Sequence, residues 1–204
     1  MTLLEVMAAA VAVVVFAVVV TPMVFRRNGP HYHCVNNLKI ISLSFEFFAI
    51  DNDGKYPFQV SMREGGSREW VPTRQAWRQF ACLSNELSTP KILKCPEDRD
   101  RVRSDVWSKF DDHGLSYFVN LSARETNDSL VLSGDRNLTL DANTVSSGLV
   151  LIDPQSNLGW NRKVHKRAGN LVLTDRSVLQ TTPAQLNCAF QNSSFGPPNL
   201  LLVP

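Results

Sequence analysis

The first twenty residues constrain this chain more than any other segment, because they are almost entirely apolar. Residues 3–20 read LLEVMAAAVAVVVFAVVV, and Glu5 is the one charged residue among them. At about 1.5 Å per residue, a helix of this length can cross a bilayer core of about 30 Å. Lipid makes a helix the expected conformation despite the many valines. A carboxylate at the centre of such a helix costs about 2.5–3.5 kcal/mol, so Glu5 requires an explanation.

The apolar run lacks the features of a cleavable secretory signal. No basic residue precedes it, and no small-residue cleavage site follows it. Arg26 and Arg27 close the run instead. By the positive-inside rule alone, these arginines would place the following domain in the cytoplasm.

A resemblance to a known family accounts for these features together. The opening MTLLEV, the apolar run and Pro22 resemble the mature N-terminus of type IV pilins and type II secretion pseudopilins. In that family a peptidase removes a short basic leader, the new N-terminal residue is N-methylated, and glutamate is the fifth residue. The resemblance therefore implies N-methylation of Met1 and roles in assembly for Glu5 and Pro22. The removed leader would also supply the missing cytoplasmic charge.

Segments farther along the chain extend the resemblance. CVNNLK, residues 51–57, residues 87–98 and GDRNLT are similar to large prepilin-type N-terminal methylation proteins of Verrucomicrobia and Planctomycetes, often labelled type II secretion proteins. These segments support a shared architecture, and the pilin-like N-terminus implies a structural subunit of a pilus-like or secretion-pseudopilus filament. The subunit would enter the inner membrane with its C-terminal domain in the periplasm and would then join a filament in the periplasm or at the cell surface. The implied partners are further copies of the chain, other pilin-like subunits, the assembly platform and the prepilin peptidase. The alternative is a single-pass anchor that tethers a periplasmic or extracellular binding or enzymatic domain.

The order of apolar patterns predicts an α+β fold. Pro22 and the sequence NGP at residues 28–30 are expected to interrupt the N-terminal helix, which then packs on an antiparallel sheet. The predicted units are an N-terminal helix and break at 1–30 and a pilin-like head at 31–204. Within the head we expect a helix at 31–52, loops and a short helix at 53–114, a β-rich part at 115–182 and a tail at 183–204.

The predicted helix 31–52 carries two apolar stripes on nearly opposite sides. One consists of Leu38, Ile41, Phe45 and Phe48, and the other of Ile40, Leu43, Phe47 and Ile50. A surface helix of a monomer needs one such stripe. Either the helix is fully buried within the head, or one stripe packs on the sheet and the other on neighbouring subunits.

The sequence offers little catalytic chemistry. It has no nucleophile elbow, phosphate-binding loop, dinucleotide motif or metalloprotease motif. His165, Asp135 and Asp175 can be drawn as a catalytic set, but they occur in strand and turn contexts where such residues are ordinary. We therefore expect neither an enzyme nor a cofactor. The net charge of +2 argues against nucleic acid as a partner.

Metal and glycan sites are not expected either. No Cys/His group has zinc spacing, and His31 and His33 do not share a helix face. The acidic turn at 51–57 resembles the start of a calcium loop, but Met62 occupies the position of its final glutamate. In a bacterial chain, N-glycosylation sequons are expected to be chance matches; they occur at Asn120, Asn127, Asn137 and Asn192.

Four cysteines permit three complete disulfide pairings, and the sequence alone leaves all three open. Cys34 lies on the predicted helix and Cys95 precedes a proline turn, so a bridge between them would fasten this loop to the helix. Closing so long a loop contributes up to about 4–5 kcal/mol. Cys82 and Cys188 are then the remaining pair.

Overall fold

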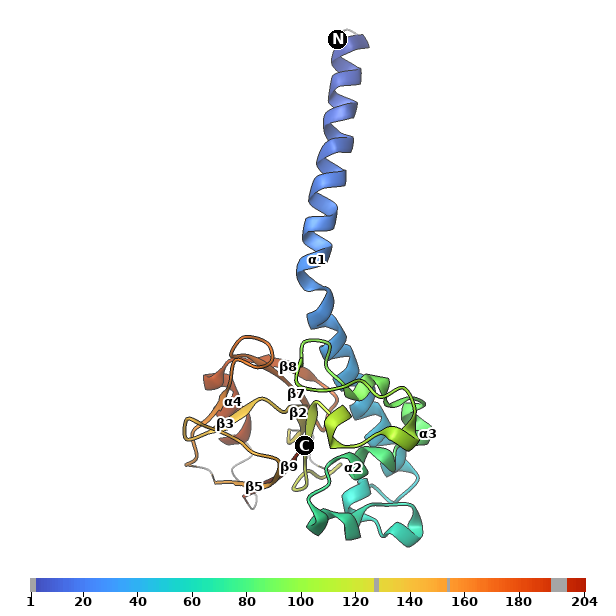
Figure 1. The fold of residues 1–204 in the computed structure, drawn as a ribbon, viewed down its shortest axis with the longest axis vertical. Helices are drawn as coiled ribbons and strands as arrows, with labels where there is room; N and C mark the ends of the chain where they lie inside the picture. Colours follow the sequence, from blue (N-terminus) through green and yellow to red (C-terminus); the bar gives the residue numbers. More distant parts are fainter. Residues whose placement is uncertain (1–2, 127–128, 154, 192–197) are drawn as a thin grey trace.

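In the computed structural model of this chain, one helix runs from the start of the described residues into a globular head. Helix α1 spans Leu3–Ile50, and its first half projects from the head as a rod (Figure 1). The structure describes residues 3–126, 129–153, 155–191 and 198–204, and for residues 20–31 it describes the backbone only. We call the part of the chain from Cys34 onward the head.

The predicted interruption of this helix is wrong. The backbone remains helical through Pro22 and through residues 28–30, so α1 is a single helix of 48 residues. A proline removes one hydrogen bond and crowds the carbonyl four residues earlier, but the bonds on either side can persist. A long helix can therefore absorb a proline as a bend where a short helix would end there.

Helix α1 ends at the predicted acidic turn. The N–H of Gly54 donates to the carbonyl of Ala49 at 2.8 Å, which satisfies a carbonyl at the end of the helix. Asp53 and Gly54 both have positive φ, at 54° and 72°. Glycine and aspartate tolerate this left-handed conformation better than most residues, so the sequence stops the helix here.

The β-rich part forms a six-stranded antiparallel sheet in the order β5-β9-β1-β2-β7-β8 and a smaller sheet in the order β4-β3-β6. The strands are β1 (Tyr117–Asn120), β2 (Val131–Asp135), β3 (Leu138–Leu140), β4 (Asn143–Thr144), β5 (Gly148–Ile152), β6 (Leu158–Trp160), β7 (Gly169–Leu173), β8 (Val178–Thr181) and β9 (Asn199–Val203). The α+β class with an antiparallel sheet is confirmed.

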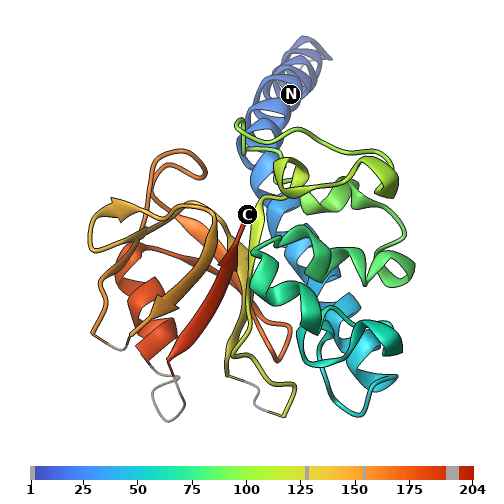
Figure 2. The same cartoon turned by 60° about the horizontal axis from the view of Figure 1, so that its bottom comes forward.

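Short helices fill the segment between α1 and the sheet, and one follows β8. The α-helices are α2 (Trp77–Ala81), α3 (Ser84–Leu87) and α4 (Pro183–Gln191). The 3₁₀ helices are η1 (Pro57–Gln59), η2 (Met62–Glu64), η3 (Arg68–Thr73), η4 (Pro90–Leu93), η5 (Trp107–Lys109) and η6 (Asp112–Gly114). Figure 2 shows α2 and α3 on the same side of the sheet as α1, with α4 on the other side.

Two hydrophobic clusters lie on opposite faces of the large sheet. Successive strand residues point to opposite faces, so Tyr117 and Val119 belong to the cluster beneath α1, while Phe118 belongs to the cluster beneath α4. Helix α1 packs against β2, β7 and β8, and α4 packs against β6 and β8. The large sheet is therefore the middle layer of the head.

Candidate functional site

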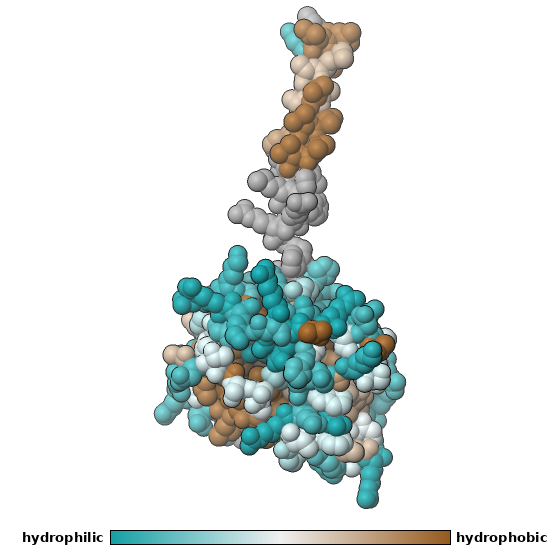
Figure 3. All heavy atoms as spheres, viewed as in Figure 1, coloured by the Kyte–Doolittle hydropathy of each residue, from teal (hydrophilic) through white to brown (hydrophobic). Residues whose placement is uncertain are grey.

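The projecting part of α1 exposes apolar side chains on every side. All residues from 3 to 19 are exposed, including Phe16 and a series of valines. Figure 3 shows brown, apolar side chains along this rod, whereas the visible face of the head is largely polar. Within the residues that the structure describes, no helix combines the length and the apolar character needed for a membrane span.

The two stripes predicted for the second half of α1 differ in burial, so the helix is not fully buried within the head. Leu38, Ile41, Phe45 and Phe48 are buried in the head. On the other side, Ile40 is half-buried, Leu43 is 41% exposed, Phe47 is 55% exposed and Ile50 is 68% exposed. We call Leu43, Phe47 and Ile50 the outer stripe. It leaves an apolar surface on the head itself.

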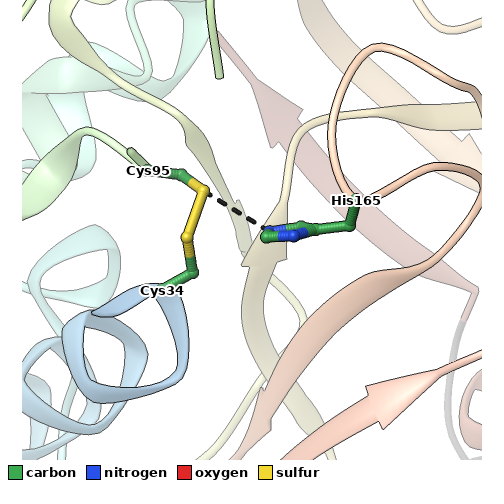
Figure 4. Close-up of side chains that lie close together, drawn as sticks. All are labelled: Cys34, Cys95 and His165. Carbon is green, nitrogen blue, oxygen red and sulfur yellow. Dashed lines mark hydrogen bonds between the residues drawn. A yellow bond between two sulfur atoms is a disulfide. The ribbon is translucent and has the colours of Figure 1, made fainter. Parts of the chain in front are cut away.

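A buried polar cluster lies where α1 meets the sheet. His165 comes from the loop between β6 and β7, Asp135 from the end of β2 and Asn170 from β7, and Glu97 and Cys95 come from the loop after η4. Cys34 of α1 completes the group (Figure 4). We call these residues the His165 cluster. Segments more than a hundred residues apart in sequence meet in it.

The loop that carries His165 has an unusual backbone. His165, Lys166 and Arg167 all have positive φ, at 53°, 52° and 70°. Such non-glycine conformations each cost about 1–3 kcal/mol and persist where the surroundings enforce them. Here the buried side-chain amide of Asn137 donates to three carbonyls of the loop, those of Asn161, Val164 and Ala168, at 3.0–3.2 Å. These bonds hold the imidazole inside the head.

Both imidazole nitrogens of His165 have close polar neighbours. Nδ1 lies 3.0 Å from a carboxylate oxygen of Glu97. Nε2 lies 3.2 Å from the amide nitrogen of Asn170 and 3.3 Å from Oδ2 of Asp135. It also lies 3.4 Å from Sγ of Cys95, a contact drawn as a dashed line in Figure 4. The side chains of His165 and Asp135 are only 2% and 0% exposed, so a substrate cannot reach them in this conformation.

Burial is the main influence on the pKa of Asp135, the fully buried acid of the cluster. It raises the pKa of Asp135 to about 7, although two hydrogen bonds from Asn170, at 2.7 and 2.8 Å, oppose this shift. Burial also raises the pKa of Tyr117, and the charge of Asp135 adds to that effect. The hydroxyl of Tyr117 accepts a hydrogen bond from Asn37 of α1 at 3.2 Å.

An ion pair borders the cluster. The guanidinium of Arg136 donates to both oxygens of Asp98 at 2.7 and 2.8 Å, and the Asp98 side chain is fully buried. Asp100 lies farther out, 3.5 Å from Arg136 and 3.1 Å from Lys163. These contacts fix the segment after Cys95 to the end of β2.

The structure contains the disulfide Cys34–Cys95, so this predicted pairing is confirmed. The pairing of Cys82 with Cys188 is wrong, because neither forms a disulfide within the described part of the chain. Cys82 follows α2 on the α1 side of the sheet, whereas Cys188 lies on α4 on the other side. The thiol of Cys82 donates to the carbonyls of Gly66 and Arg78.

The catalytic set drawn from the sequence comes together only in part. His165 and Asp135 are neighbours, but Asp175 lies in the turn between β7 and β8, where its carboxylate accepts from the N–H of Ser177 at 2.8 Å. Glu97, Asn170 and the disulfide were not recognised as part of this group. The signal for them was weak, because their spacing matches no motif and only the fold brings them to His165.

The remaining predicted site residues fall at scattered places. Met1 lies outside the described residues, and Pro22 is within the part of α1 for which only the backbone is described. His33 is exposed, and the side chain of His31 is not described. Of the sequons, Asn120 and Asn137 are buried and Asn127 and Asn192 lie outside the described residues.

Comparison with known proteins does not assign a family. No protein-family model, curated protein or solved structure matches this chain.

Proposed function

We propose that this protein is a structural subunit of a filament of the type IV pilus or type II secretion pseudopilus kind. The observation that carries the proposal is α1, whose residues 3–19 expose apolar side chains on all sides while its second half packs on the sheet. A helix that is apolar all round needs apolar surroundings. The same segments of neighbouring subunits, packed together in a filament core, supply them.

Before assembly, the inner membrane would provide these surroundings. The apolar run continues in the sequence to Val20, and we place the head in the periplasm at this stage. The prepilin peptidase would remove a leader and leave a methylated Met1, and an assembly platform would move the subunit from the membrane into the filament. The filament then lies in the periplasm or at the cell surface.

Glu5 has a specific role in this proposal. Once a leader has been removed, the α-amine of Met1 would be the closest positive group to Glu5, because the next is Arg26, about 30 Å away along a helix. Pairing Glu5 with the Met1 amine of a neighbouring subunit would set the axial position of each incoming subunit. In apolar surroundings, loss of one partner leaves a buried charge that costs about 3–5 kcal/mol.

The outer stripe gives the head a contact surface of its own. Leu43, Phe47 and Ile50 continue along the same helix that provides the apolar rod. Repeated head-to-tail contacts that do not close into a ring produce filaments. We therefore place the outer stripe in contact with the α1 helix of an adjacent subunit.

The test is the substitution Glu5→Leu, compared at matched expression with wild type. We expect membrane insertion and the fold of the head to be unchanged and incorporation into sheared, purified filaments to fall at least about tenfold, as one uncompensated charge predicts. Glu5→Gln should behave similarly, because the charge is the essential property. Mass spectrometry of the mature N-terminus should find a methylated Met1.

Glu64→Leu is the matched control, because it removes an exposed carboxylate from η2 in the head. It should leave the filament yield unchanged. Wild-type filament yield from Glu5→Leu would refute the positioning role of Glu5. An unprocessed N-terminus together with a failure to recover the chain in any filament would favour a simple membrane tether.

A further inference from the structure

Three side chains of the His165 cluster have the chemistry of a zinc site. The sulfurs of Cys34 and Cys95 and a ring nitrogen of His165 all lie within 4.8 Å of one another. Figure 4 shows the imidazole directed at the two sulfurs, from the opposite side of the cluster to α1. Thiolate and imidazole are the usual ligands of structural zinc. In the oxidised protein, however, the two sulfurs are bonded to each other.

We propose that reduction of the Cys34–Cys95 disulfide converts this cluster into a Zn²⁺ site with Cys34, Cys95 and His165 as ligands. A dithiol reductant breaks the S–S bond by supplying two electrons and two protons, and it becomes a disulfide itself. Zn²⁺ then binds both sulfurs as thiolates and releases the two thiol protons to solvent. The metal replaces the covalent link between α1 and the loop after η4.

The geometry requires only a small rearrangement. With Zn–S bonds of about 2.3 Å and a Zn–N bond of about 2.0–2.1 Å, a tetrahedral site separates its sulfurs by about 3.8 Å and each sulfur from the nitrogen by about 3.6 Å. Nε2 of His165 already lies 3.4 Å from Sγ of Cys95. The Cα atoms of the two cysteines are 5.3 Å apart, so side-chain rotation can separate the sulfurs without moving α1.

A second observation concerns the far side of the imidazole. A zinc-bound histidine almost always donates its other ring N–H to a carboxylate, a carbonyl or a water, which fixes the tautomer. Here Nδ1 lies 3.0 Å from Oε2 of Glu97, but the contact does not have hydrogen-bond geometry in the oxidised protein, so the bond would form as the ring turns toward the metal. A proton on Nδ1 leaves the lone pair of Nε2 directed toward the sulfurs. Glu97 is therefore placed as the residue that positions His165 for the metal.

A buried carboxylate lies beside His165, outside the group of three ligand atoms. Asp135 is fully buried, and Oδ2 of its carboxylate lies 3.3 Å from Nε2 of His165. Its other oxygen, Oδ1, has no hydrogen-bond partner among the residues that the structure describes. Most buried oxygens of this kind have a partner, so Asp135 is a candidate for the fourth ligand if its carboxylate turns toward the metal.

The experiment uses the full chain in detergent micelles, reduced with a phosphine that is itself oxidised to the phosphine oxide. Co²⁺ is the spectroscopic probe and Zn²⁺ the competitor. We expect the reduced protein to bind one equivalent of Co²⁺ with tetrahedral d–d bands and thiolate charge-transfer absorption, and Zn²⁺ to abolish both. The oxidised protein should give neither signal. Octahedral Co²⁺ without thiolate absorption would overturn the proposal.

Two variants separate ligand from positioning roles. His165→Ala should weaken Zn²⁺ binding by more than about 100-fold, and Glu97→Gln by about 10–100-fold, as the loss of an outer partner usually does. Cys82→Ser and Glu64→Gln are controls that remove a thiol and a carboxylate outside the cluster, and both should bind zinc like wild type. Wild-type affinity in His165→Ala would show that the metal binds elsewhere.

Glu97→Gln keeps the proposal testable if His165→Ala does not fold, because the Glu97 side chain is partly exposed and its replacement keeps the shape of the group. Unchanged affinity in a folded Glu97→Gln protein, as judged by circular dichroism, would contradict the assigned geometry. The zinc site does not depend on the filament proposal. Glu5→Leu should bind zinc like wild type, so the two proposals can fail separately.

Discussion

At the scale of single residues, the buried ion pair between Asp98 and Arg136 is important for the stability of the head. The Asp98 carboxylate is fully buried and makes two hydrogen bonds with one guanidinium. Removing one partner of such a pair leaves the other charge buried without compensation, which costs far more than the pair itself contributes. The pair also holds the segment that carries Cys95 and Glu97 against the sheet. Loss of this ion pair would therefore also disturb the positions of Cys95 and Glu97 in the His165 cluster.

We expect Asp98→Ala to lower the free energy of unfolding by about 3–5 kcal/mol. Urea denaturation of the full chain in mild detergent, followed by tryptophan fluorescence, measures the change. The control is Asp105→Ala, whose carboxylate is exposed and pairs with Lys91 and Arg103 at the surface. This control should change the same quantity by less than about 1 kcal/mol. Equal effects of the two variants would contradict the importance of burial.

Glu69 gives a prediction for pH. The N–H of Met62 and the hydroxyl of Ser61 both donate to its carboxylate, and these hydrogen bonds, the one from the Met62 backbone above all, lower the pKa of Glu69 to about 2. A carboxyl with a lowered pKa stabilises the fold above its unfolded pKa of about 4.3, and this contribution disappears as the pH falls toward 2.

Glu69→Gln should therefore have a lower urea midpoint than wild type at pH 7, and the two midpoints should converge near pH 2. The difference will be small, because the group is exposed and solvent screens it. Midpoints of both proteins measured between pH 2 and pH 7 provide the check. A difference between the two urea midpoints that stays constant from pH 2 to pH 7 would mean that the charge of Glu69 does not contribute to stability.

At the scale of elements, one face of α1 is buried in the head and the other is exposed, and the filament proposal assigns the exposed face to contacts between subunits. Phe45 lies on the buried stripe, where its ring makes edge-to-face contacts with Tyr56 and Phe80. Phe47 lies two residues farther along and is more than half exposed. The same substitution at these two positions therefore tests two different properties of one helix.

Phe47→Asp should leave thermal unfolding of the head within a few degrees of wild type and should greatly reduce recovery in sheared filaments. Phe45→Asp should abolish cooperative unfolding, because it buries a charge among aromatic rings. The two measurements are a thermal melt and the yield of filament pelleted after shearing. Normal filament yield from Phe47→Asp would exclude the outer stripe from the subunit interface.

Helical and strand periodicity were the most reliable guides to these elements. The apolar stripes placed Leu38 and Phe45 in the core, and the β-rich part predicted at 115–182 holds β1 to β8, whereas β9 lies in the predicted tail. Sequence could not show that α1 continues through Pro22, because a proline permits either a break or a bend. Nor could it place Glu97 beside His165, because that contact depends on how two distant loops pack. The Cys34–Cys95 disulfide could be suggested from the sequence, because a bridge between a helix residue and a cysteine beside a proline turn would fasten that loop to the helix.

At the scale of the whole molecule, the described core of the head begins at Cys34, and it includes none of the exposed residues 3–19. We expect a fragment that starts at His31 to fold cooperatively without detergent. Its melting temperature should lie within a few degrees of that of the full chain, because residues 3–19 are exposed and bury nothing against the head. Differential scanning calorimetry of the fragment tests this. Non-cooperative melting would mean that the rod contributes to the stability of the head.

The position of β9 determines when the large sheet can be completed during synthesis of the chain. This strand lies between β5 and β1, and it pairs Leu202 with Val119 and with Leu149. The chain leaves the ribosome with its N-terminus first, so α1 emerges long before residues 199–203 are made. Until then, β5 has no neighbour in the large sheet and β1 presents an open edge. The large sheet can therefore be completed only after residues 199–203 have been made, and α1 has left the ribosome well before that point.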